Sequence, residues 1–233
     1  MPLLNPVQAV TFDVGGTLLE PSPSVGHVYA EVATQFGITS VAPEELNQRF
    51  ATAWRMRRGF DYSRAAWRDL VNQTFADLCP EPPTLACFDA IYHRFALAKS
   101  WSVFGDVRPV LAALKAGGFK LGVISNWDER LCPLLEEIGL AGHFDAIVAS
   151  HEAGHRKPSA EIFHLAARRL GLSIKAMLHV GDSIAEDVAG AKAAGAQAVL
   201  LDRGGRQTGE AAVRSLGQLA AVLGPAPVKT PTD

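Results

Sequence analysis

The sequence has few cysteines, no excess of basic residues and no long apolar run, and each absence argues against a class of protein. Its three cysteines (Cys79, Cys87 and Cys132) are odd in number and lack C-x-x-C spacing, which argues against a disulfide framework and a zinc site. No apolar stretch approaches the ~20 residues of a membrane-spanning helix, and the first ten residues do not resemble a signal peptide. We therefore expect a cytoplasmic protein with reduced thiols and no membrane partner.

The charge and hydrophobic content are those of an ordinary globular protein. A net charge of -2 at pH 7 argues against a nucleic-acid partner. With 48% hydrophobic residues, the 233-residue chain can form one sizeable core, or a core with a modest inserted domain.

Most of the chain alternates short apolar runs with helical patterns. Within residues 103–224, stretches rich in Val, Ile and Leu predict buried strands at 120–125, 146–150, 177–181 and 197–201, and residues 9–14 have the same texture. Between these runs, apolar residues recur at three- and four-residue spacing, which predicts helices at 107–118, 129–139, 159–171 and 184–195. Such alternation predicts an α/β fold with a Rossmann-like, doubly wound parallel sheet.

Residues 19–102 have a different texture, with no comparable strand. Four amphipathic helical patterns, separated by Pro, Gly and Ser, cover 25–37, 43–59, 63–79 and 84–100. The sequence therefore predicts a helical domain inserted after the first strand. We expect a core of residues 1–18 and 103–224, a helical insertion at 19–102 and a disordered tail at 225–233.

Polar residues follow the predicted strands at the positions where ligands of parallel sheets bind. Asp13 follows the first strand, Ser125-Asn126 end the next, Lys157 lies in the loop after 146–150, and Asp182 follows 177–181. These loops would bring two carboxylates, a hydroxyl and an ammonium group to one edge of the sheet.

Four segments, in order, resemble the motifs of the haloacid dehalogenase superfamily of hydrolases. They are "FDVGGTL" (12–18), "ISN" (124–126), "RKPSAEIF" (156–163) and "GDSIAEDVAGAKAAG" (181–195). The resemblance covers the chain except its tail, and it implies that the helical insertion is a mobile cap.

The resemblance also implies a role for each matched residue in phosphoryl transfer. Asp13 would be the nucleophile and form an aspartyl-phosphate, and the Lys157 ammonium would offset negative charge. The phosphate would be bound by Gly16, Thr17, Ser125, Asn126 and Lys157. For two of these residues a purely structural role stays open: Thr17 could be a turn residue, and Ser125 could be only a helix cap.

A magnesium ion is the cofactor that the resemblance implies. Its ligands would be the carboxylates of Asp13 and Asp182 and the carbonyl of Gly15, since hard cations prefer oxygen. Asp187 would bind the metal through water or orient Lys157.

Gly15 departs from the family pattern and raises a question about turnover. Phosphatases of the family carry an Asp there that protonates the leaving group, dehalogenases a Tyr, and phosphonate-cleaving members an Ala. His27, Asp61 or Asp128 could replace that acid, and Lys99 is the one cap lysine for phosphonatase chemistry. Without a replacement, only good leaving groups should depart readily.

We therefore predict a Mg2+-dependent phosphatase that acts on a small phosphorylated metabolite. A 2-haloacid dehalogenase is the alternative enzyme, although Asp182 favours metal and phosphate. A catalytically weak protein that binds phosphate and metal is the alternative outside enzymes. Cap arginines could contact substrate or form a solvated face; they are Arg55, Arg57, Arg58, Arg64, Arg68 and Arg94.

Overall fold

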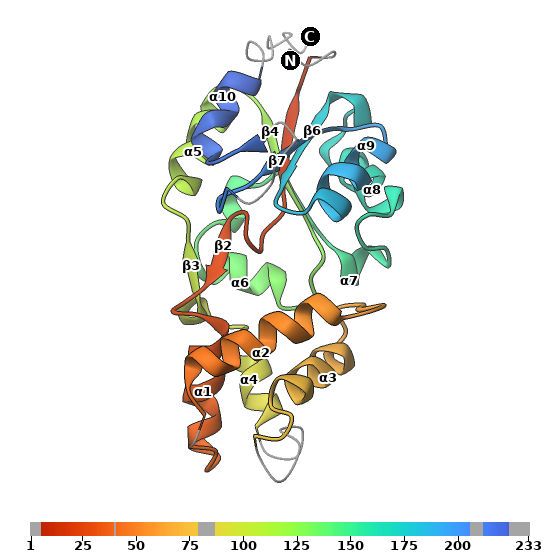
Figure 1. The fold of residues 1–233 in the computed structure, drawn as a ribbon. Helices are drawn as coiled ribbons and strands as arrows, with labels where there is room; N and C mark the ends of the chain where they lie inside the picture. Colours follow the sequence, from red (N-terminus) through yellow and green to blue (C-terminus); the bar gives the residue numbers. More distant parts are fainter. Residues whose placement is uncertain (1–5, 40, 79–86, 206–211, 224–233) are drawn as a thin grey trace. The chain divides into compact units, whose positions relative to one another are not determined.

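The chain folds into two compact units in the computed structural model (Figure 1), which describes residues 6–39, 41–78, 87–205 and 212–223. Met1–Leu19 and Val103–Asp233 form the core unit, and Glu20–Ser102 form the helical unit. The expected tail at 225–233 and Cys79 lie outside the described residues. No helix in the described ranges has the length and apolar character needed to cross a membrane.

The core unit is built on a six-stranded sheet with the strand order β5-β4-β1-β6-β7-β8. Every pairing along this order is parallel. The α/β fold with a Rossmann-like parallel sheet expected from the apolar runs is thereby confirmed. The strands are β1 (Ala9–Phe12), β4 (Lys120–Ser125), β5 (Ala146–Ala149), β6 (Met177–Gly181), β7 (Gln197–Leu201) and β8 (Ala212–Val213).

Helices cover both faces of this sheet, with α5 and α10 on one side and α8 and α9 on the other (Figure 1). On the second side, α8 presents Ile162, Phe163 and Ala166 to a fully apolar cluster that includes Ile124 and Val148. Burying such side chains contributes about 1.5–3 kcal/mol each, which fixes the strands whose ends carry the polar residues. The helices of the core are α5 (Val107–Ala116), α6 (Leu131–Glu137), α7 (Ser150–Ala153), α8 (Ala160–Leu170), α9 (Gly190–Ala193) and α10 (Leu219–Val222).

The helical unit contains the four helices that its amphipathic patterns predict. They are α1 (Val25–Gln35), α2 (Pro43–Met56), α3 (Arg64–Thr74) and α4 (Phe88–Arg94). Tyr29, Leu46, Val71 and Ile91 come from different helices and meet in one apolar cluster. The unit therefore has a hydrophobic core of its own.

Two strands border the helical insertion, where the sequence predicted none. β2 (Leu19–Pro21) and β3 (Trp101–Val103) form a separate two-stranded sheet, and the Ser22 amide donates to the Ser100 carbonyl at 2.8 Å. Three-residue strands are too short for a period-2 pattern, which is why they escape detection. The two segments in which the chain passes from one unit to the other are thus paired with each other.

The turn after β1 uses its two glycines differently. Gly16 has φ +76°, and a Cβ there would overlap the Asp182 carboxylate. Gly15 has an ordinary φ, and a Cβ there would meet only the Trp127 ring edge, at 3.6 Å, among the described residues. The conformation therefore demands glycine at position 16 but not at position 15.

Replacement by alanine should separate these two glycines. Gly16→Ala should lower the free energy of unfolding by about 1–2 kcal/mol, because a side chain opposes the left-handed conformation. It should also displace the Asp182 carboxylate. Gly15→Ala, the matched control, should change stability by less than about 1 kcal/mol. Urea unfolding of both variants measures this difference, and equal losses would show that the turn has another conformation.

Candidate active site

Four segments of the core unit converge at the carboxyl ends of β1, β4 and β6, which are neighbours in the sheet. Phe12 is in register with Val123 and with Val180. Asp13 therefore follows β1 at the level where Ser125 ends β4 and Gly181 ends β6. Adjacency of these strands is what brings residues more than a hundred positions apart together.

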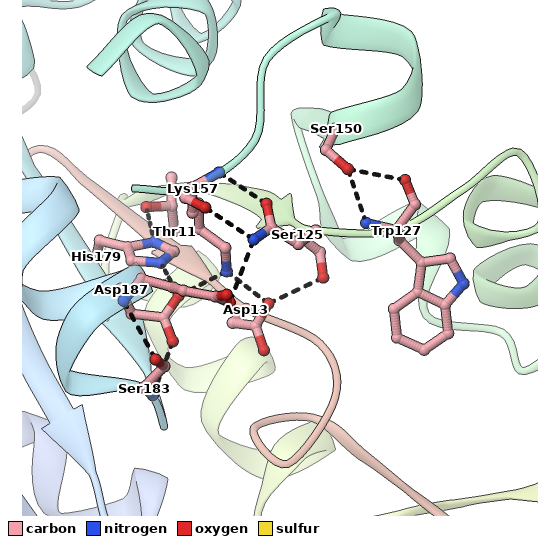
Figure 2. A network of polar contacts seen from close by, with 11 residues as sticks. Thr11, Asp13, Ser125, Trp127, Ser150, Lys157, His179, Ser183 and Asp187 are labelled. Atoms are coloured by element: carbon pink, nitrogen blue, oxygen red, sulfur yellow. Dashed lines mark hydrogen bonds and ion pairs between the residues drawn. The ribbon is translucent and has the colours of Figure 1, made fainter. Parts of the chain in front are cut away.

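The Lys157 ammonium lies at the centre of this convergence (Figure 2). Its Nζ is 2.6 Å from Asp13 Oδ1 and 2.5 Å from Asp187 Oδ1, and the lysine side chain is 2% exposed. The Ser125 hydroxyl donates to the same Asp13 oxygen at 2.9 Å. Both contacts to Asp13 use Oδ1, so Oδ2 receives neither of them.

Asn126, the residue after β4, forms two hydrogen bonds with the backbone of Lys157. Its Oδ1 accepts from the Lys157 amide at 2.7 Å, and its Nδ2 donates to the Lys157 carbonyl at 3.0 Å and to Glu186 at 3.2 Å. Two reciprocal hydrogen bonds fix the loop that presents the ammonium group. The phosphate contact predicted for Asn126 stays a prediction, since its amide already serves Lys157.

Asp187 lies in a π-helical turn, Ile184–Ala189, where the sequence predicted a regular helix. The turn is capped reciprocally, because Ser183 Oγ accepts from the Glu186 amide at 3.1 Å and the Ser183 amide donates to Asp187 Oδ2 at 2.9 Å. A Cβ on Gly181 would overlap the Asp187 side chain, so glycine at the end of β6 lets the carboxylate approach. Such wide turns recur at functional sites.

Two residues that the sequence patterns did not single out, His179 and Thr11, form a chain of polar contacts that ends at Asp187. His179 Nε2 is 3.1 Å from Asp187 Oδ1, and His179 Nδ1 is 3.0 Å from the Thr11 hydroxyl (Figure 2). Thr11 and His179 are register partners on β1 and β6, and both are fully buried. Their signal in the sequence is a polar residue inside an otherwise apolar, buried strand.

The electrostatics of the cluster follow from burial and from charge. Burial alone would lower the pKa of Lys157, but the carboxylates of Asp13 and Asp187 overcome it and raise that pKa. Burial opposes ionisation of Asp187 as well, yet Lys157 and His179 hold the pKa of Asp187 well below its usual range. The lysine and Asp187 are therefore a stable ion pair. Burial lowers the pKa of His179, so its ring is neutral at pH 7.

The other two carboxylates respond in the opposite direction. Burial raises the pKa of Asp13, with Lys157 opposing the shift. Loss of solvent and the negative charges of Asp13 and Asp187 raise the pKa of Asp182 to about 7. Burial is the largest cause of both shifts, and the charge of a neighbouring carboxylate adds to it in each case.

The site has the donors that a hard divalent cation needs. Asp13, Asp182 and Asp187 each offer an oxygen, and these atoms lie within 4.8 Å of one another. When all three are ionised, these carboxylates and the Lys157 ammonium carry two net negative charges, which a cation such as Mg2+ would balance. Both oxygens of Asp187 are engaged by Lys157, His179 and Ser183, whereas Asp182 keeps exposed surface although its carboxyl group is largely removed from solvent. The arrangement fits the metal, with Asp13 and Asp182 better placed than Asp187 to bind it.

The remaining residues of the β1 turn are close to Asp13 in sequence and tightly bonded. The Gly16 amide donates to the Leu19 carbonyl at 2.8 Å, and Thr17 is fully buried. Thr17 Oγ1 has no hydrogen-bond partner among the described residues. Phosphate contacts of Gly16 and Thr17, and the Gly15 carbonyl as a metal ligand, stay predictions.

The candidates for a substitute acid are occupied by local contacts. Arg130 holds both oxygens of Asp128, at 2.8 Å and 2.6 Å. His27 contacts Ser24 at 2.8 Å, and Asp61 accepts from the Ser63 amide at 2.9 Å. None of these three contacts connects the residue to Asp13.

Several arginines of the helical unit are engaged within that unit. Arg64 pairs with Asp89 at 2.8 Å, and Arg94 pairs with Glu31 at 3.1 Å. The Arg57 guanidinium lies 3.5 Å from the centre of the Trp54 ring. A contact between these arginines and a substrate stays a prediction.

Comparisons with known proteins identify relatives of this chain. The haloacid dehalogenase-like hydrolase family matches residues 7–195. The chain is 34% identical over 209 residues to haloacid dehalogenase-like hydrolase domain-containing protein 3 of Danio rerio, covering 85% of this chain and 86% of that protein. It is 32% identical over 211 residues to glyceraldehyde 3-phosphate phosphatase of Methanopyrus kandleri, covering 85% of each.

One similar solved structure bears the name of a dehalogenase. The 2-haloacid dehalogenase of Pseudomonas syringae pv. Tomato is 26% identical, with a TM-score of 0.66, over 93% of this chain and 98% of that one. The matched region contains every segment that converges on Lys157. On the strength of the family match and of these relatives, the chain belongs to the haloacid dehalogenase-like hydrolases.

Proposed function

We propose that this hydrolase is a Mg2+-dependent phosphatase of a small phosphorylated metabolite, working through an aspartyl-phosphate on Asp13. One observation carries the proposal: a buried ammonium contacts the Asp13 carboxylate at 2.6 Å, and Asp13 belongs to a cluster of three carboxylates. A site with this charge pattern suits a dianionic phosphate accompanied by a cation better than a neutral or singly charged substrate.

The first step transfers the phosphoryl group to Asp13. A carboxylate oxygen of Asp13 forms a bond to phosphorus while the bond from phosphorus to the leaving oxygen breaks, and that oxygen keeps the electron pair. Lys157 and Ser125 hold the Asp13 carboxylate in one orientation, so little conformational freedom is lost at the moment of attack.

Charge on the phosphoryl group is offset by residues of three strand ends. We expect Thr17 to donate to a phosphoryl oxygen, and we expect Ser125, the Gly16 amide and Asn126 to do so after giving up their present hydrogen bonds to Asp13, Leu19 and Lys157. Lys157 supplies a fixed positive charge. Asp13, Asp182 and the Gly15 carbonyl would hold Mg2+, with Asp187 behind Lys157. When bound, the metal ion would neutralise phosphate charge and orient the phosphoryl group for in-line attack.

The second step is attack of water on the Asp13 phosphate, which restores the carboxylate and releases inorganic phosphate. With glycine at position 15, no carboxylate of the turn takes a proton from this water. General acid–base assistance typically contributes ~10²–10⁴-fold, so the first step depends on an activated leaving group, and the second step is expected to be slow because no adjacent base activates the water. The helical unit would act as a cap that excludes bulk water.

Two other functions make opposite predictions. A 2-haloacid dehalogenase, the activity of the Pseudomonas structure, would release halide from 2-chloropropionate without metal. A binding protein of low activity would hold phosphate and Mg2+ but turn over rarely. The Asp182 carboxylate supports the phosphatase, because halide displacement has no need for a metal ligand there. We also propose a cytoplasmic location and no nucleic-acid partner.

Phosphate release tests the proposal. Wild-type protein should release inorganic phosphate from activated phosphomonoesters only with Mg2+, and Asp13→Asn should lower the rate by at least about 10³-fold, because the amide is not nucleophilic. Asp69→Asn, at an exposed position of α3, is the matched control and should keep the wild-type rate. Activity of Asp13→Asn at the control level, or metal-free halide release instead, would refute the phosphatase.

Metal binding provides an independent test. Asp182→Ala should weaken Mg2+ binding by at least about tenfold, because it removes a hard oxygen donor from the mouth of the site. Calorimetric titration of Mg2+ into wild type, Asp182→Ala and the control Asp69→Ala measures this. Unchanged affinity in Asp182→Ala would show that the cation lies elsewhere.

A further inference from the structure

The open position beside the nucleophile carries a second piece of information about the substrate. Gly15 lies two residues after Asp13, and among the described residues a side chain there would first meet the Trp127 ring edge, at 3.6 Å. Where a proton-donating side chain could project, this chain therefore presents a partly exposed indole. An indole ring offers an apolar plane and has no proton suited to a departing oxygen at pH 7.

Hydrogen bonds fix the backbone of Trp127. Its amide donates to Ser150 Oγ at 3.1 Å, and its carbonyl accepts from Ser150 Oγ and from the His151 amide, both at 3.1 Å. It directly follows Asn126, which is clamped to Lys157. In Figure 2 the indole points away from Ser150 toward the chain that follows Asp13. A ring carried on a fixed backbone has fewer degrees of freedom to lose when a ligand packs on it.

On the basis of the proposed function, we infer that Trp127 contacts the leaving group and that the preferred substrates are phosphate esters of flat aromatic alcohols. The reaction at Asp13 forms one P–O bond and breaks another, and the leaving oxygen departs with its electron pair and no proton from position 15. A phenolic leaving group tolerates this because its ring delocalises the charge. The same ring can pack on the indole in an offset or edge-to-face arrangement.

Two substrates of high intrinsic reactivity separate packing from leaving-group strength. 4-Nitrophenyl phosphate has an aromatic leaving group, and acetyl phosphate has a small one without a ring. For each protein, the quantity of interest is the ratio of kcat/KM for the aryl ester to kcat/KM for acetyl phosphate. Both substrates are assayed on one preparation, so the ratio does not depend on the fraction of folded protein.

Trp127→Leu should lower this ratio by about 2- to 12-fold, the effect of losing one aromatic pair. Trp127→Phe keeps an aromatic ring and should keep the ratio within about twofold of wild type. Equal losses of both activities in Trp127→Leu, with an unchanged ratio, would overturn the inference and leave the phosphatase intact. No phosphate release by wild type from either substrate would overturn the proposed function, and this inference with it.

Discussion

The ammonium group of Lys157, buried between the carboxylates of Asp13 and Asp187, is the interaction on which the site depends. A buried charge without partners costs several kcal/mol, so the ammonium requires both carboxylates to be near and ionised. Each partner comes from a different strand end, and Ser125 completes the set from a third. Because the Lys157 ammonium must contact both carboxylates, it fixes the relative positions of the loops that carry these groups.

The parallel sheet makes this convergence possible, and a few local devices complete it. Glycine at position 181 lets the π-helical turn bring Asp187 over the end of β6, and glycine at position 16 lets the chain pass beside Asp182. Behind them, Thr11 and His179 place a polar pair inside the sheet to support Asp187. Hydrogen bonds and ion pairs hold the Lys157, Asp13 and Asp187 side chains in place. Beside Gly15, in contrast, there is room for a Cβ atom.

The sheet and the residues at its strand ends could be predicted from the sequence, because buried parallel strands are short, continuous apolar runs and ligands gather where such strands end. Asp13, Ser125, Lys157 and Asp187 are brought into contact as that rule implies. The clamp by Asn126 could not be predicted, since its partner is a backbone group 31 positions away. Nor could the π-helical turn, whose sequence has ordinary helical spacing, or the three-residue strands at the unit boundary.

In the proposed mechanism, Asp13 carries the phosphoryl group between two chemical steps, and the second step is slow. Acid quenching during turnover of acetyl phosphate with Mg2+, followed by peptide mass spectrometry, tests this directly. We expect one added phosphoryl group on the peptide containing Asp13, labile to hydroxylamine and absent from Asp13→Asn. Turnover with the phosphoryl group on another residue, or with no phosphorylated peptide at any time point, would contradict it.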